Sequence, residues 1–291
     1  MQALVNNTTG SQNNAIGYQA LFGNTTGRRN NAIGYRVLAN NTTGESNNAF
    51  GAFALASNTT GVGNSANGTF ALVNNTTGFL NIAYGEGALF NNDSGGLNIA
   101  IGDLAFSSNI TGRSNTIIGA RADASAFNLN NATAIGANAR VNASNKIRLG
   151  SDAVTVIEGQ VGFTAVSDKT QKENFQPVDG EAVLGKIRGF ELTSWNFIGH
   201  DPKEFRHYGP MAQEFFAAFG QDGVGQIGTE TTINSGDMAG ILMIAVQALE
   251  KRTAELKQKE AKIAVLESRL EALELRQNQS CLLYTSDAAD E

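Results

Sequence analysis

Residues 24–40 read NTTGRRNNAIGYRVLAN, and residues 41–57 repeat the pattern as NTTGESNNAFGAFALAS. The unit recurs every 17 residues through the first half of the chain. Two glycine series keep this period: Gly10, Gly27, Gly44, Gly61, Gly78, Gly95 and Gly112, with Gly17, Gly34, Gly51, Gly68, Gly85, Gly102 and Gly119. A fixed period indicates an array of stacked structural units. We therefore expect residues 1–126 to form stacked coils.

The composition of the unit predicts the shape of each coil. An apolar run, as around Ile16, is followed by an apolar pair such as Leu21-Phe22, and Asn, Thr and Gly fill the remainder as turn formers. Glycine accepts the positive φ that a tight corner requires. This pattern predicts two short strands per coil in a parallel β-roll or β-solenoid, a mostly β fold. Seven coils at about 4.8 Å each would give a rod of roughly 34 Å.

The array suits a stalk better than a catalytic pocket. One coil buries few side chains, so we expect several chains to associate. A calcium-binding solenoid would need many aspartates, and residues 1–150 hold only Asp93, Asp103 and Asp123. An ice-binding face is disfavoured, because adjacent threonines such as Thr8 and Thr9 would point to opposite faces of a strand. Sugar binding along the stalk stays open, although no residues mark a site.

The end of the array carries a second type of motif. Residues 134–139 read AIGANA and residues 145–150 read NKIRLG. These stretches resemble the head repeats of trimeric autotransporter adhesins, whose AIG-type motifs form a β-roll trimer. The resemblance implies an adhesin-head-like β transition over residues 127–166 and a homotrimer.

Composition limits the function classes. Residues 1–150 carry 8 Lys and Arg against 5 Asp and Glu, and residues 151–291 carry 13 against 22, so neither half favours nucleic acid. No apolar run approaches the roughly 20 residues that span a bilayer. We expect no cofactor and no metal. The chain opens inside a repeat and lacks a signal peptide, so we expect it to be a fragment.

The last eleven residues, CLLYTSDAADE at 281–291, break the preceding pattern and resemble a translated sequencing adapter. We interpret them as an artefact. Cys281 is the only cysteine, so the natural segment offers no disulfide and no cysteine-metal site.

A different module follows the array. It begins with a strand-like segment, TVIEGQVGF at 155–163, followed by SDKTQKEN at 167–174. A strand with Trp195 and Phe197 comes next, and YGPMAQEF at 208–215 then begins a short helix. This order closely resembles the C-terminal intramolecular chaperone domain of phage endosialidases, tail spikes and tail fibres. The resemblance implies a small α+β chaperone auto-processing domain over residues 167–237, which assembles a trimer and then releases itself.

In that family the peptide bond before the motif serine is cut. The resemblance therefore implies cleavage between Val166 and Ser167, with Ser167 as nucleophile and Lys172 as base. A serine hydroxyl needs a base to become a good nucleophile. Lysine can serve only if burial lowers its pKa from about 10.4 toward neutrality. The alternative interpretation is an ordinary turn at Ser167-Asp168, with Lys172 as a solvated charge.

The supporting motif comprises Asp168, Asn174, His207, Gly209, Gln213 and Glu214. We expect Asp168 to shape the turn, and Gly209, Gln213 and Glu214 to support the fold or the geometry of the site. His207 would orient a partner residue or serve as an ordinary surface histidine.

The C-terminal segment 238–280 predicts an apolar helix that continues as a coiled coil. Its heptad a positions are Leu242, Leu249, Leu256, Ile263 and Leu270, and its d positions are Ala245, Arg252, Lys259, Leu266 and Leu273. The seam is weak in the middle and strong at its end. A helix folded back on the chaperone domain is the alternative.

Together these features predict a homotrimeric fibre protein on a virion tail or a bacterial surface. Its only enzymology would be single-turnover autoproteolysis by a Ser-Lys peptidase mechanism. Its partners would be copies of itself and a cell-surface receptor or glycan. The alternative is an adhesin in which the C-terminal module is a passive, uncleaved trimerisation domain. A glycan hydrolase lacks support, because the repeats show no paired carboxylates.

Overall fold

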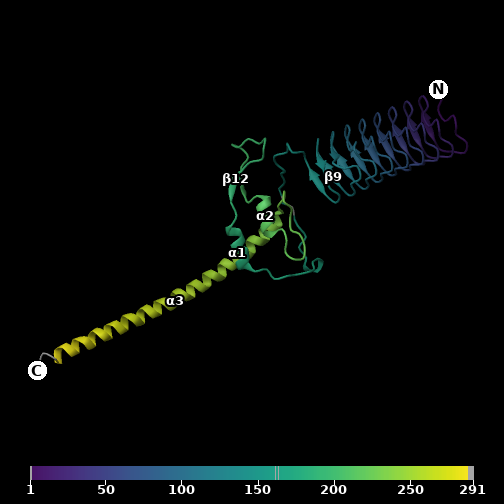
Figure 1. The fold of residues 1–291 in the computed structure, drawn as a ribbon. Coiled ribbons are helices and arrows are strands. Elements are labelled where there is room, and N and C mark those ends of the chain that lie inside the picture. The colour runs from purple at the N-terminus through teal and green to yellow at the C-terminus, as the bar shows by residue number, and fades with distance from the viewer. Residues whose placement is uncertain (1, 161, 163, 288–291) are drawn as a thin grey trace. The chain divides into compact units, whose positions relative to one another are not determined.

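The computed structural model describes residues 2–160, 162 and 164–287. The chain divides into two compact units, Met1–Glu158 and Gly159–Glu291, which Figure 1 shows as a stack of coils and a helical region.

The first unit is a parallel β-solenoid, which confirms the predicted fold class. Its described part holds a 9-stranded sheet in the order β1-β2-β3-β4-β5-β6-β7-β9-β11. The strands are β1 (Asn14–Ile16), β2 (Asn31–Ile33), β3 (Asn48–Phe50), β4 (Ser65–Asn67), β5 (Ile82–Tyr84), β6 (Ile99–Ile101), β7 (Thr116–Ile118), β9 (Thr133–Ile135) and β11 (Ile147–Leu149). Residues one repeat apart pair directly, as Ala15 with Ala32, so the sequence period is also the strand register.

The expectation of two strands per coil was wrong for most of the array. Each coil from β1 to β7 has one three-residue strand, and its second apolar segment forms turns. Leu21 and Leu38 in these turns take left-handed φ values of 51° and 50°. Both leucines are fully buried, and burying a leucine contributes about 2 kcal/mol, which offsets a backbone strain of similar size. A second short sheet forms only at the end, between β8 (Asp123–Ala124) and β10 (Arg140–Val141).

The core of the solenoid consists of stacked alanines and leucines. In β1 to β6 and in β9 the central residue is an alanine that faces the core, as Ala32 and Ala49 do at 0% exposure, and in β7 the buried central residue is Ile117. The flanking isoleucines and aromatics point outward, since Ile16 is 53% and Phe50 36% exposed. The outer residues of these apolar runs are thus exposed in the single chain. The core of the array is complete within one chain, so the expected association of several chains is not needed to bury it.

Two ladders of buried asparagine run along this core. They are Asn7, Asn24, Asn41, Asn58, Asn75, Asn92 and Asn109, and Asn13, Asn30, Asn47, Asn64, Asn81, Asn98 and Asn115. Asn7 and Asn13, which begin the ladders, are half-buried and donate only to a backbone carbonyl. Each later side-chain amide is buried and donates both to the asparagine one coil back and to a backbone carbonyl, as Asn64 Nδ2 does to Gly78 O at 2.8 Å. The buried amides are therefore satisfied, as buried polar groups must be.

The second unit has little regular structure besides its helices. It comprises the 3₁₀ turn η1 (Lys169–Gln171), α1 (Gly180–Arg188), the hairpin strands β12 (Thr193–Trp195) and β13 (His207–Gly209), α2 (Ala212–Phe219) and α3 (Ser235–Asp287). Val183, Phe215, Phe219 and Ala245 form its small core. No helix in the described part of the chain is long and apolar enough to cross a membrane.

Three expectations for this unit need correction. The described residues of segment 155–163 form no strand, because no neighbouring strand is there to pair with them. Phe197 lies outside β12 and is 56% exposed, so it is not a core residue. The last helix begins at Ser235, before the predicted start, and its backbone continues through Cys281 to Asp287.

Candidate active site

A short turn brings Ser167 and Lys172 together. Asp168 caps η1, and its Oδ1 accepts a hydrogen bond from the Thr170 backbone N–H at 2.9 Å. This bond and one from the Thr170 side chain lower the pKa of the Asp168 carboxyl. The Lys172 backbone N–H then donates to Lys169 O at 3.2 Å, which closes the turn. The capped turn holds the two predicted catalytic side chains on the same side of the backbone.

The Lys172 Nζ donates to Ser167 Oγ at 2.6 Å. This distance lies within the reach that a general base needs to remove a proton from a hydroxyl. Ser167 directly follows the Val166 carbonyl, so the hydroxyl, the amine and the predicted scissile bond all lie within one turn. Both side chains are exposed in the single chain.

The arrangement can perform acyl transfer if Lys172 becomes neutral. A neutral amine could accept the Ser167 proton, whereas an ammonium can only donate to the oxygen. The pair therefore has the spacing that proton transfer requires.

The rest of the supporting motif lies on other elements. His207 lies on β13, where its ring stacks on Trp195 with centroids 4.7 Å apart. Gly209 ends β13 with a left-handed φ of 148°, opposite Thr193 of β12. Gln213 and Glu214 lie in the first turn of α2. Gln213 is exposed, whereas Glu214 Oε2 is buried without a hydrogen-bond partner among the described residues.

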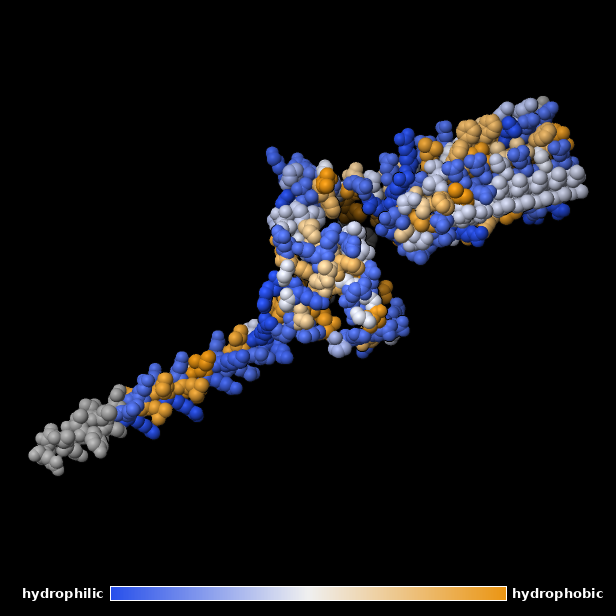
Figure 2. Space-filling model, viewed as in Figure 1, coloured by the Kyte–Doolittle hydropathy of each residue, from blue (hydrophilic) through white to orange (hydrophobic). Residues whose placement is uncertain are grey.

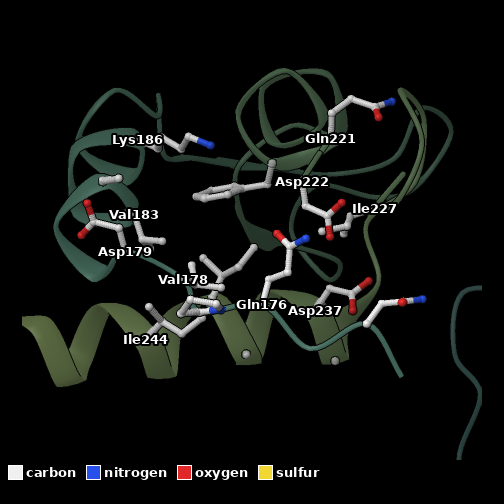
Figure 3. A pocket seen from close by; sticks show the side chains of 17 residues that line it. Gln176, Val178, Asp179, Val183, Lys186, Gln221, Asp222, Ile227, Asp237 and Ile244 are labelled. Atoms are coloured by element: carbon white, nitrogen blue, oxygen red, sulfur yellow. The ribbon is translucent and has the colours of Figure 1, made fainter. Parts of the chain in front are cut away.

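An apolar cavity of about 560 Å³ lies beside α1, α2 and α3 (Figure 3). Val183, Phe219 and Ile244 line it, together with the charged residues Asp222 and Lys186. Backbone hydrogen bonds from Gly225 and Val224 lower the pKa of Asp222. The cavity lining therefore combines apolar side chains with a few charged ones.

Asn174 is the one motif residue that lines this cavity, and it takes a left-handed φ of 57°. Neither Ser167 nor Lys172 lines the hollow. A second hollow of about 610 Å³ brings Gly209 and Gln213 together beside Trp195.

The structure thus places the predicted site residues in separate local groups. Ser167, Asp168 and Lys172 share one turn, while His207 and Gly209 share β13. Within the described residues, no hydrogen bond or ring contact links the two groups. These assignments stay predictions.

Two polar contacts were missed by the sequence analysis. Arg206 Nη2 donates across the hairpin to Ser194 O at 2.9 Å and to Ser194 Oγ at 2.6 Å. Arg252 of α3 donates through two nitrogens to both carboxylate oxygens of Glu181 on α1. No sequence signal could reveal the second pair, because its partners lie 71 residues apart.

Comparison with known proteins gives one family. Residues 167–224 match the family model described as chaperone of endosialidase. The match begins at Ser167 and covers η1, α1, the hairpin and α2. No curated protein and no solved structure gave a significant match. The chaperone domain is thereby supported, while the resemblance of the array to adhesin heads stays a prediction.

Proposed function

We propose that this chain is a homotrimeric fibre protein, on a virion tail or a bacterial surface, whose C-terminal chaperone domain assembles the trimer. The domain then cleaves its own chain between Val166 and Ser167. The solenoid would form the lasting fibre, with a receptor or glycan as its external partner. The boundaries 1–126, 127–166, 167–237 and 238–280 remain the proposed domains.

One observation carries the cleavage proposal. The 2.6 Å contact between Lys172 Nζ and Ser167 Oγ occurs at the first residue of the match to the chaperone family. A surface lysine bonded to a serine has little meaning alone. Its place at the start of the matched chaperone domain supports a catalytic role for the pair.

The proposed reaction follows from the position of Ser167 after the scissile bond. Lys172, as a neutral amine, takes the proton of Ser167 Oγ while the oxygen attacks the Val166 carbonyl carbon. The carbon–nitrogen bond breaks as the serine nitrogen takes a proton, and an ester joins Val166 to Ser167 Oγ. Water then hydrolyses the ester, which leaves a Val166 carboxylate and a new amino terminus at Ser167.

Assembly would explain both the use and the control of this reaction. A chaperone that joins three chains raises the effective concentration of their stalks. Covering the exposed pair in the trimer would favour the neutral lysine, so that cleavage follows assembly. After release of the clamp, the trimer would persist because its unfolding is slow.

The alternative is a passive trimerisation domain on an uncleaved adhesin. It predicts the same assembly but an intact Val166–Ser167 bond. The state of that bond therefore separates the two functions.

The experiment is the intact mass of the purified chain, beside Ser167→Ala and Lys172→Ala. We expect wild-type protein to yield a product that ends at Val166, and both variants to stay full length. Lys169→Ala is the matched control, because this exposed lysine lies in the same turn without bonding Ser167. It should cleave like the wild type. Release of the C-terminal fragment by Ser167→Ala would refute the mechanism.

A further inference from the structure

Two adjacent positions of the repeat, which follow the first glycine of each unit, change character along the solenoid. In the first three coils they are polar: Ser11-Gln12, Arg28-Arg29 and Glu45-Ser46. In the next three coils they are apolar or glycine: Val62-Gly63, Phe79-Leu80 and Gly96-Leu97. Polar residues then return with Arg113-Ser114. One stretch of this corner therefore differs from the rest of the array.

Leu80 and Leu97 are the unusual residues of this stretch. They take left-handed φ values of 53° and 61°, and they remain 52% and 49% exposed. A left-handed φ is unfavourable for most residues that carry a Cβ. Leu89 has a similar φ of 53° but is fully buried, so packing offsets its strain. Strain at an exposed leucine has no such compensation and indicates a role other than stability.

The same position later in the array holds residues that suit this backbone. Asn131 and Asn145 occupy it with φ values of 52° and 57°. Asparagine tolerates the left-handed conformation, because its short polar side chain can form local hydrogen bonds. The corner geometry therefore does not require the leucines at positions 80 and 97.

Phe79 and Arg113 extend the apolar surface around these leucines. The Phe79 ring lies against Gly96, where a Cβ would come within 2.7 Å of the ring carbons. The Arg113 guanidinium lies over the same ring, 5.6 Å from its centroid. Figure 2 shows apolar side chains of the coils as orange patches among pale and blue residues. We define the corner patch as Val62, Phe79, Leu80, Leu97 and Arg113.

The chemistry of the corner patch fits a polypeptide better than a sugar. Arg113 supplies the one polar side chain of the patch. The backbone N–H groups of Leu80 and Leu97 are already bonded to carbonyls of the preceding coil, both at 2.9 Å. The hydroxyl groups of a glycan would therefore find few partners. Aromatic and arginine side chains without central acidic residues are typical of protein–protein interfaces.

Arg113 specifies the charge of the partner. Its side chain is exposed, and no carboxylate in the described part of the chain forms an ion pair with it. A guanidinium group binds a carboxylate through two parallel hydrogen bonds. The corner patch spans three coil spacings, roughly 14 Å, which is the length of about four residues of extended chain.

We propose that the corner patch binds a short segment of another protein, in which apolar side chains lie next to an Asp or Glu. Phe79 and the two leucines pack against the apolar side chains, and Arg113 pairs with the carboxylate. The existence of an external partner rests on the proposed function. The position and chemistry of the site rest on the strain, exposure and charge of the corner patch.

Hydrogen exchange of the full chain tests whether the leucines serve the fold. Leu80→Asn and Leu97→Asn should leave exchange protection across residues 62–114 unchanged or raise it, because asparagine suits the left-handed φ. Leu89→Asn is the matched control, since Leu89 shares the backbone conformation but is buried. It should lower protection strongly. Equal losses in the three variants would overturn the proposal, since the exposed leucines would then be structural.

Binding is measured with a display library of random peptides, selected on the immobilised full chain. The selected peptides should combine apolar residues with a carboxylate. A synthetic copy of one should bind Leu97→Asn and Arg113→Glu about tenfold more weakly than wild type. Arg28→Glu changes the same repeat position outside the corner patch and should bind like the wild type. Replacing the peptide carboxylate by a lysine should restore binding to Arg113→Glu.

Three results would overturn the proposal. The first is a library without selected peptides, or peptides that bind all variants equally. The second is a glycan array in which a sugar binds wild type but not Leu97→Asn, which would make the patch a glycan site. The third is a Leu97→Asn chain that loses an oligomer, which would assign the patch to a second copy. An intact Val166–Ser167 bond would refute the proposed cleavage alone, because these measurements do not depend on it.

Discussion

Removal of a single amide from an asparagine ladder should open the solenoid locally. Asn75 is fully buried at the centre of the array. Its Nδ2 donates to Asn58 Oδ1 at 2.8 Å and to Gly78 O at 3.2 Å, and its Oδ1 accepts from Asn92 Nδ2 at 2.7 Å. Asn75→Ala deletes all three hydrogen bonds at once.

The magnitude follows from the groups that stay behind. The substitution leaves Asn58 Oδ1 and one N–H of the Asn92 amide without this partner, whereas Gly78 O keeps its hydrogen bond from Asn64. Each unsatisfied buried group costs about 1–3 kcal/mol, so at the lower limit the local opening free energy falls by about 2 kcal/mol. Each 1.4 kcal/mol is about a factor of ten, so amide protection in the affected coils should fall by about 30-fold or more.

Hydrogen exchange measured on peptides from residues 58–92 of the full chain provides the assay. Asn74→Ala is the control, because Asn74 is the preceding residue and its side chain is exposed. It should change protection by less than a few fold. Equal effects of the two substitutions would refute the idea that the ladder, rather than turn propensity, explains the asparagines.

Two further substitutions test the packing of each unit. Gly85 has a φ of 137°, and a Cβ there would lie 2.2 Å from Gly102 O. Gly85→Ala should therefore lower the hydrogen-exchange protection of its coil. Unchanged protection would contradict the proposed need for glycine at this corner. In contrast, nothing lies within 4 Å of a Cβ at Gly185 inside α1, and Gly185→Ala should stabilise the second unit by up to about 1 kcal/mol in urea unfolding. The hydrogen bond from Arg252 lowers the pKa of Glu181, so this pair should stabilise the unit fully above about pH 4.3 and lose its effect as pH falls through the lowered pKa. The pH dependence of unfolding should therefore flatten in Glu181→Gln, and a profile identical to wild type would show that the pair contributes nothing.

The sequence predicted the solenoid because its corners demand glycine at a constant interval. Gly17 and its equivalents adopt positive φ and leave no room for a Cβ against the next coil. The direction of the strand side chains was not evident, since both Ala and Ile are apolar. In β2 Ala32 is buried and Ile33 is half-buried, whereas in β7 the same inward position holds Ile117, so residue type alone does not fix the direction.

The asparagine ladders had a signal that turn chemistry concealed. The asparagines at the positions of Asn24 and Asn30 recur in every repeat, as the glycines do, whereas the residues at the positions of Arg28 and Arg29 vary. Asparagine is a frequent turn residue, so its repetition alone did not indicate a buried hydrogen-bonded row. Position-by-position constancy within the repeat was the more informative feature.

The turn at the candidate site was accessible from sequence because it is local. Five residues separate Ser167 from Lys172, and one capped turn brings them together. The placement of His207 depends on the pairing of β13 with β12, where its ring stacks on Trp195, and no local pattern encodes that pairing. The same holds for Arg252, whose contact with Glu181 of α1 joins residues that lie 71 positions apart.

The most direct test of the central claim is native mass spectrometry of the full chain, sampled from early to late times after purification. The account predicts an early species of three times the 30.6 kDa chain mass, followed by a trimer of chains that end at Val166. In Ser167→Ala the first species should persist. A wild-type protein that stays monomeric throughout, or a monomer that cleaves itself before any trimer is present, would contradict the account.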